Sequence, residues 1–223
     1  MSMEASSMYP EGASGHSVYT RFTLAVYDWY MLGVSNRFVW KCPTERLVAH
    51  FDRHVTDNHL DVGVGTGYFL DVCRFPSDTP RIGLLDLNPC SLARTSQRIA
   101  RYKPEVFWRN ALEPIELNGD RYDSISLNYV LHCLPGTMQE KAVVFDHLRK
   151  HLNPGGTLFG STLLHTGVTR TPVARRLMNL YNRKRIFSNR DDDLEQLKAI
   201  LEERFPHSGI EIVGCAALFW ARA

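Results

Sequence analysis

Cysteine pairs, net charge and long apolar runs are all scarce in this sequence, and each shortage excludes a class of protein. The five cysteines are scattered and odd in number, with no C-x-x-C pair. This argues against a disulfide framework and against a structural zinc site, so we expect reduced thiols and no bound metal. The formal net charge is only +2. A charge this small does not favour nucleic acid or an anionic membrane as partner.

Apolar segments long enough to span a bilayer are also missing. No uncharged apolar run approaches the ~20 residues that a transmembrane helix requires. Residues Met1–Ser7 have neither a basic start nor an apolar core, so no secretory signal is visible. We therefore expect a cytoplasmic protein that does not insert into membranes.

The chain has the length and composition of one ordinary globular domain. It has 223 residues, of which 44% are apolar and 22% charged. Residues 1–17 are polar and contain Pro10, Gly12 and Gly15, so we expect a flexible N-terminal segment. The domain is then residues 18–223, and within it the aromatic-rich residues 18–56 are expected to form a helical lid or substrate-binding part.

Short apolar runs alternate with helical patterns after residue 58. The predicted strands are His59–Gly63, Arg81–Asp86, Glu105–Trp108, Tyr122–Asn128 and Thr157–Thr162. The predicted helices between them are Tyr68–Arg74, Pro89–Tyr102 and Thr137–Leu152. Such alternation predicts an α/β fold with a doubly wound, mainly parallel sheet.

Capping residues set several of these boundaries. Asn88 followed by Pro89 is a favourable helix start, and Thr137–Glu140 has the form of a capping box. Asn153–Gly156 is expected to end the preceding helix and turn the chain into a strand. Near the C-terminus we expect helices at Pro172–Asn182 and Asp191–Arg204. One or two strands should then follow within Ile210–Ala221, with a bend at Gly214.

The sharpest motif is a turn with glycines at alternate positions, 63, 65 and 67, between an apolar strand and a helix. Glycine permits positive φ and lets a ligand approach the backbone, while the helix start offers free N–H groups. The next predicted strand ends in Asp86. A carboxylate there can accept hydrogen bonds from both hydroxyls of a ribose.

Two other interpretations of this motif are open. One is a generic tight turn followed by an acidic helix cap. The other is a dinucleotide site, but the third glycine comes one residue earlier than in the G-x-G-x-x-G fingerprint. Asp61, just before the turn, would also repel a pyrophosphate and would favour a ligand carrying an ammonium or sulfonium group.

Taken together, these residues resemble the class I S-adenosylmethionine-dependent methyltransferases. The glycine turn is similar to the first motif of that family, and Tyr122–Pro135 and Leu152–Leu158 resemble its fourth-strand loop and its turn into the fifth strand. The resemblance covers about residues 57–162. It implies a seven-stranded Rossmann-like sheet with an antiparallel last strand, and S-adenosylmethionine as cofactor with S-adenosylhomocysteine as product.

The same resemblance implies which residues meet the cofactor. The expected set is Asp61, Gly63, Gly65, Gly67, Asp86, Leu87, Asn110, Ala111, Leu112, Asn128 and Tyr129. In the family an aspartate is commoner than an asparagine at the position of Asn110, but an amide can also meet the adenine edge.

His132 is the candidate general base, because it follows the predicted cofactor-facing loop and histidine titrates in a useful range. The other interpretation is a histidine packed for structural reasons. An acidic enol or phenol acceptor would need little help from a base. Candidate substrate residues are Tyr19, Tyr27 and Tyr30 in the aromatic segment and His165 after the fifth strand.

We therefore expect a methyltransferase that acts on a small molecule, with a hydroxyl of a secondary metabolite such as a polyketide as the acceptor. The short chain with an aromatic N-terminal part resembles methyltransferases of secondary metabolism. The alternatives are an RNA or protein methyltransferase, or a binding or cyclising protein that does not methylate. A basic tract between Arg175 and Arg190 could face RNA, but Asp191–Asp193 follow at once and favour a solvated face.

Overall fold

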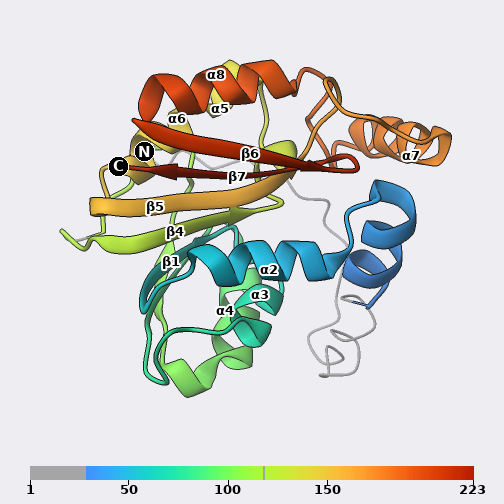
Figure 1. Ribbon diagram of the computed structural model, residues 1–223. Helices are drawn as coiled ribbons and strands as arrows, with labels where there is room; N and C mark the ends of the chain where they lie inside the picture. Colours follow the sequence, from blue (N-terminus) through green and yellow to red (C-terminus); the bar gives the residue numbers. More distant parts are fainter. Residues whose placement is uncertain (1–28, 118) are drawn as a thin grey trace, which may run out of the picture.

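The computed structural model describes residues 29–117 and 119–223, and within them the chain forms one seven-stranded sheet between helices (Figure 1). The strands are β1 (Asn58–Val62), β2 (Arg81–Asp86), β3 (Glu105–Trp108), β4 (Tyr122–Asn128), β5 (Leu152–Leu163), β6 (His207–Val213) and β7 (Ala216–Arg222). Their order is β3-β2-β1-β4-β5-β7-β6; the two pairs that include β7 are antiparallel, and the other pairs are parallel. The doubly wound α/β fold and its antiparallel last strand are confirmed.

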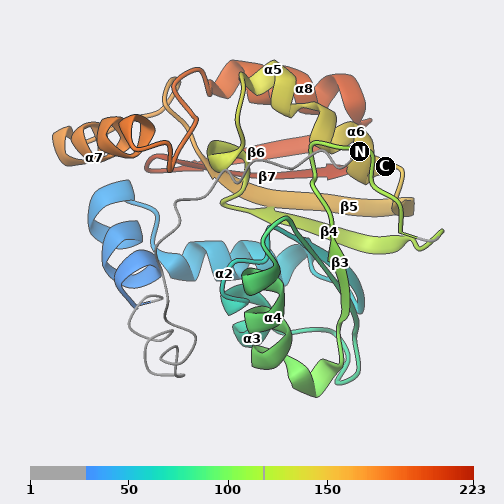
Figure 2. The same cartoon turned by 180° about the vertical axis from the view of Figure 1, so that it is seen from behind.

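The helices cover both faces of this sheet, as Figures 1 and 2 show from opposite sides. The α-helices are α2 (Thr44–His54), α3 (Tyr68–Val72), α4 (Pro89–Arg98), α5 (Met138–Lys141), α6 (Val143–Arg149), α7 (Pro172–Arg183) and α8 (Leu194–Arg204). The π-helix η1 (Trp29–Trp40) and the 3₁₀ turns η2 (Ala100–Tyr102) and η3 (Leu131–Cys133) complete the set. No helix in the described ranges is both long and apolar enough to span a bilayer.

Two buried clusters of apolar side chains hold the layers together. Helices α2, α3 and α4 pack through residues such as Phe51, Leu70 and Leu92 on one face. Helices α5, α6 and α8 pack through residues such as Phe145 and Leu197 on the other. Helix α2 is thus part of a covering layer, whereas η1 and α7 lie together beside the end of the sheet (Figure 2).

The helix starts predicted from capping residues are confirmed, whereas several predicted helix ends differ from the structure. Asn88 accepts a hydrogen bond from the Cys90 N–H (2.9 Å), and Thr137 and Glu140 form the complete capping box. The helix predicted over 137–152, however, splits into α5 and α6 and ends at Arg149. The helix predicted over 68–74 ends at Val72, and that over 89–102 continues beyond Arg98 only as a 3₁₀ turn.

The prediction that strand β5 begins at Thr157 was wrong, because the strand already begins at Leu152. The backbone of the expected turn is held by the end of the chain: the Gly155 N–H donates to Ala223 and the Ala223 N–H donates to Gly156. Leu152 also pairs with Tyr122 of β4. Pairing with two segments distant in sequence therefore extends the strand through the Pro-Gly-Gly sequence. The bend at Gly214 is confirmed, with φ of 60°.

A buried ion pair fixes the segment that follows α7. Lys141 of α5 is fully buried, and its Nζ donates to Asp192 Oδ1 and to the Ser188 carbonyl, both at 2.6 Å. The Asp192 carbonyl in turn accepts from the N–H groups of His165 and Thr166. We call this ion pair and its hydrogen bonds the clamp. The clamp holds residues 185–192, which include Phe187, against the carboxyl end of β5.

We expect Lys141→Met to be strongly destabilising, because it leaves the buried Asp192 carboxylate without its cation. The loss should be about 3–5 kcal/mol, which lowers the thermal midpoint by roughly 10 °C. The double variant Lys141→Met/Asp192→Leu should recover part of that loss. Thermal and urea unfolding measure both; a single variant as stable as the parent would contradict a structural role for the clamp.

Candidate active site

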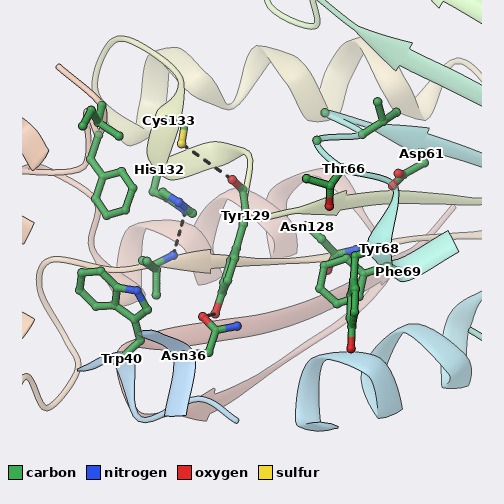
Figure 3. A pocket seen from close by; sticks show the side chains of 16 residues that line it. Asn36, Trp40, Asp61, Thr66, Tyr68, Phe69, Asn128, Tyr129, His132 and Cys133 are labelled. Atoms are coloured by element: carbon green, nitrogen blue, oxygen red, sulfur yellow. Dashed lines mark hydrogen bonds between the residues drawn. The ribbon is translucent and has the colours of Figure 1, made fainter. Parts of the chain in front are cut away.

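A cavity of about 350 Å³ lies at the carboxyl ends of β1, β4 and β5. Figure 3 shows the glycine-turn side of this cavity opposite a wall of aromatic and polar side chains. It is lined by Asn36, Trp40, Asp61, Gly63, Val64, Gly65, Thr66, Tyr68, Phe69, Asn128, Tyr129, His132, Cys133, Leu163, Ile186 and Phe187. The cavity thus brings together the predicted residues Asp61, Gly63, Gly65, Asn128, Tyr129 and His132.

Each glycine of the turn has positive φ, but their surroundings differ. A Cβ at Gly63 would lie 2.4 Å from Val130 Cγ2, and one at Gly67 would lie 2.8 Å from Thr95 Cγ2. A Cβ at Gly65 would meet no atom within 4 Å. Packing therefore explains the outer two glycines, while Gly65 leaves open backbone for a ligand.

Asp86 ends strand β2 beside this turn. Its Oδ1 accepts a hydrogen bond from the Asn88 N–H (2.8 Å), and the backbone N–H groups of Val64, Gly65 and Leu87 also point to its carboxylate. Burial is the largest influence on this carboxyl and raises its pKa, against the lowering effect of those N–H groups. The carboxylate is therefore held in one orientation.

Outside the lining of the 350 Å³ cavity lie the other predicted cofactor residues, Gly67, Asp86, Leu87, Asn110, Ala111 and Leu112. The Arg109 N–H donates to the Asp86 carbonyl, which places the following residues beside the end of β2. Asn110 turns its amide to Glu113 and accepts from the Leu112 N–H, and Ala111 is buried. Leu87 is 53% exposed, so it offers an apolar surface beside the carboxylate.

Asp61 faces the cavity from the carboxyl end of β1. It is 6% exposed and hydrogen-bonded to the Ser126 hydroxyl of β4. Burial raises the pKa of Asp61 to about 7, against the lowering effect of the hydrogen bond with the Ser126 hydroxyl, and the nearby Asp86 adds to the rise. A cation bound at this carboxylate would reverse the effect of burial.

Asn128 and Tyr129 mark the point where β4 leaves the sheet. Asn128 Oδ1 accepts from Ser161 Oγ (3.1 Å), while its buried Nδ2 has no partner among the described atoms. Tyr129 has φ of 57°, which is uncommon for a residue with a side chain and typical of functional sites. Its hydroxyl donates to Asn36 of η1 (3.2 Å), so the strained residue connects the sheet to the N-terminal helix.

His132 is buried in the cavity wall between two aromatic rings, with centroid distances of 5.4 Å to Tyr129 and 4.6 Å to Phe187. The Leu163 N–H approaches Nδ1 at 3.3 Å. Because a backbone N–H can only donate, Nδ1 is the unprotonated nitrogen of the neutral ring and Nε2 carries the hydrogen. Burial, with Lys141 nearby, lowers the pKa of His132 to about 3.

Three titratable side chains of the cavity share one electrostatic property. Burial raises the pKa of Asp61 and of Tyr129, and it lowers the pKa of His132. In each case burial favours the neutral form of the group. The cavity is therefore a weakly polar environment in which an added charge is poorly screened.

Several lining residues escaped prediction from sequence. Ile186 and Phe187 lie in a basic tract that gave no sign of a pocket, and Asn36 lies among aromatic residues that drew attention instead. The predicted residues Tyr19 and Tyr27 lie outside the described residues, as does the side chain of Tyr30. His165 is not part of the cavity wall, and its ring is directed to Asn179 of α7.

Comparison with known proteins places these features in a family. The model of the family "Methyltransferase domain" matches residues 60–158. Demethylluteothin O-methyltransferase of Streptomyces thioluteus is 37% identical over 207 residues, which cover 93% of this chain and 90% of that protein. Physcion biosynthesis cluster O-methyltransferase of Aspergillus chevalieri is 32% identical and is covered to 94%, with 93% of this chain aligned.

Solved structures agree on the fold. The structure of an O-methyltransferase family protein from Burkholderia thailandensis aligns with a TM-score of 0.63 and 19% identity, over 89% of this chain and 59% of that one. At this identity the likeness concerns the fold alone. The strand order, the glycine turn and the full-length relatives lead to one conclusion: the chain belongs to the methyltransferase family.

Proposed function

We propose that the protein transfers the methyl group of S-adenosylmethionine to a hydroxyl of a small, largely apolar secondary metabolite such as a polyketide. The observation that carries this proposal is that one cavity has the glycine turn on one side and an aromatic wall on the other. A cofactor on one side and an acceptor on the other would share that space. The named O-methyltransferase relatives support the acceptor class.

The residues present fit this cofactor. Gly65 leaves room for it, and Asp86 is oriented to accept hydrogen bonds from a ribose. Asp61 would face its ammonium group, and Asn128 Nδ2 is a buried donor that still lacks a partner. Leu87, Asn110, Ala111 and Leu112 would surround the adenine. When bound, the cofactor supplies an electrophilic methyl group on a sulfonium centre.

The acceptor side of the cavity is made of Trp40, Phe187, Ile186 and Leu163, with Asn36 and His132 as its polar groups. Trp40 and Phe187 have ring centroids 6.0 Å apart, and Ile186 is half exposed at the edge. Such a wall suits a flat conjugated molecule with few polar groups. The small volume of the cavity and the lack of charged side chains among the described residues of this wall disfavour a nucleic-acid or protein chain as acceptor.

Because the low pKa of His132 makes it a poor base, the site favours an acceptor that ionises readily, a phenol or an enol. Transfer from a cationic donor to an ionised oxygen cancels two opposite charges, and that attraction is strongest where water is excluded. His132 is a poor general base with its low pKa, but its Nε2–H can donate to the ionised acceptor oxygen and orient it. His132 thus remains the candidate catalytic residue, with a donor's role.

Ligand-dependent stability tests the cofactor. S-adenosylmethionine or S-adenosylhomocysteine at ~100 times its dissociation constant should stabilise the fold by about 2.7 kcal/mol and raise the thermal midpoint by roughly 5–10 °C. The shift should be lost in Asp86→Ala, kept in the exposed control Asp78→Ala, and absent with NAD. A midpoint that neither adenosyl ligand moves would contradict the proposal.

The pH dependence of methyl transfer tests the acceptor and His132 together. With a series of substituted phenols, the acid limb of kcat should follow the pKa of each phenol, because the substrate ionises without a strong base. His132→Gln, which keeps an N–H donor, should retain more activity than His132→Ala, which should lose about 10–100-fold. Product analysis by mass spectrometry identifies the methylated atom.

Two results would count against this mechanism. An acid limb fixed at one pH for every phenol, and abolished in His132→Gln, would make His132 a general base. Methylation of amines but not of any phenol or enol would show that the acceptor atom is nitrogen.

A further inference from the structure

A chain of hydrogen bonds runs from the cavity into the core between β1 and β4. The two strands pair in parallel with His59 beside Ser124 and Asp61 beside Ser126. His59 Nδ1 lies 2.8 Å from Ser124 Oγ, and His59 Nε2 lies 3.0 Å from Ser126 Oγ. Ser126 Oγ is in turn hydrogen-bonded to Asp61. His59 and both serines are completely buried.

The inner end of this chain fixes which nitrogen of His59 carries a hydrogen. The Thr56 hydroxyl donates to the Asn58 carbonyl (3.1 Å), which can only accept. Thr56 Oγ1 therefore accepts from the Ser124 hydroxyl, 2.8 Å away. With its hydrogen used, Ser124 must accept from His59, so Nδ1 is protonated.

The outer end then requires one further proton. A neutral His59 with hydrogen on Nδ1 must accept at Nε2, and among the described residues only the Ser126 hydroxyl is placed to donate to it. Ser126 then has no second hydrogen to donate to an ionised Asp61. Every hydrogen bond of the series is therefore made only if the Asp61 carboxyl is protonated and donates to Ser126. The alternative is an imidazolium at His59 with an ionised Asp61, which holds the same number of protons.

The surroundings of His59 disfavour the imidazolium. The rings of Phe51, Phe75 and Phe159 lie around it at centroid distances of 5.4, 6.4 and 5.8 Å. Burial lowers the pKa of His59 to about 3, whereas it raises that of Asp61. The proton therefore belongs on Asp61.

The groups that face Asp61 from other elements do not change this assignment. Asp86 at the end of β2 is an acid, and its charge favours protonation of Asp61. Cys73, after α3, is neutral because burial raises its pKa to about 12. No basic side chain in the described part of the chain contributes to the pKa of Asp61.

We propose that His59, Ser126 and Ser124 keep the Asp61 carboxyl protonated in the free protein, and that binding of the cofactor's ammonium group ionises it and releases one proton to solvent. This rests on the proposed function, because it assumes an adenosyl ligand in the cavity. The O–H bond of Asp61 breaks, its proton passes to water, and the carboxylate then accepts from the ammonium. His59 and the serines are positioning residues that act through Asp61.

Calorimetry of S-adenosylhomocysteine binding in two buffers of different ionisation enthalpy counts the released protons. The unaltered protein should release about one proton per ligand at pH 6, and fewer as the pH approaches 7.5. Below the pKa of Asp61 the affinity should weaken by up to tenfold for each unit that the pH falls.

Ser124→Ala removes a hydroxyl that does not touch Asp61. It frees His59 to carry its hydrogen on Nε2, so that Ser126 can donate to an ionised Asp61. Release at pH 6 should then fall below about half a proton. The matched control is Ser96→Ala, which removes a buried hydroxyl that is not part of these hydrogen bonds. It should behave as the parent protein does.

The outcomes separate this proposal from the function on which it rests. Binding of S-adenosylhomocysteine without proton release overturns the proposal and leaves the cofactor assignment intact. The same holds if Ser124→Ala releases as many protons as the parent protein, because Asp61 would then hold its proton without help from Ser124 and His59. If S-adenosylhomocysteine does not bind at any pH, both the proposal and the proposed function are contradicted. If Ser124→Ala does not fold, infrared spectroscopy tests the same proton. A protonated-carboxyl band at pH 6, absent from Asp61→Asn, should disappear when S-adenosylhomocysteine is added.

Discussion

The pairing of β1 with β4 is the constraint on which the rest of the structure depends. From β1 the chain winds outward through β2 and β3, and from β4 it winds the other way through β5 to β7 and β6. At such a reversal the loops at the carboxyl ends diverge, and a crevice opens between them. The glycine turn after β1 and the Asn128–Tyr129 corner after β4 form the two sides of that crevice.

Much of this arrangement could be predicted because its causes are local in sequence. The cap at Asn88, the capping box at Thr137 and the bend at Gly214 depend on a few adjacent residues. The glycine turn and Asp86 could be placed at one edge because parallel strands share their carboxyl ends. The extension of β5 to Leu152 could not, since it follows from pairing with Tyr122 of β4 and with the last residue of the chain, both distant in sequence.

The chemical state of the site was less accessible from sequence, because it depends on contacts between distant residues. His132 was a reasonable candidate base by position, but the Leu163 N–H from β5 occupies the nitrogen that a base would use. Phe187 lies in a segment that the distant residues Lys141 and Asp192 help to hold in place. The state of Asp61 depends on register: a shift of one residue between β1 and β4 would turn Ser126 to the other face.

The burial that keeps the cavity side chains neutral has a consequence for selectivity. Polyphenolic metabolites carry several hydroxyls of similar shape, and a pocket that recognises shape alone would separate them poorly. Under the proposed mechanism, in which His132 does not act as a base, ionisation of the acceptor adds a second criterion, because only the hydroxyl that ionises most readily becomes a nucleophile. Water and aliphatic alcohols fail that criterion even when they reach the methyl donor. The pocket could therefore accept molecules of different shapes and still select which hydroxyl is methylated.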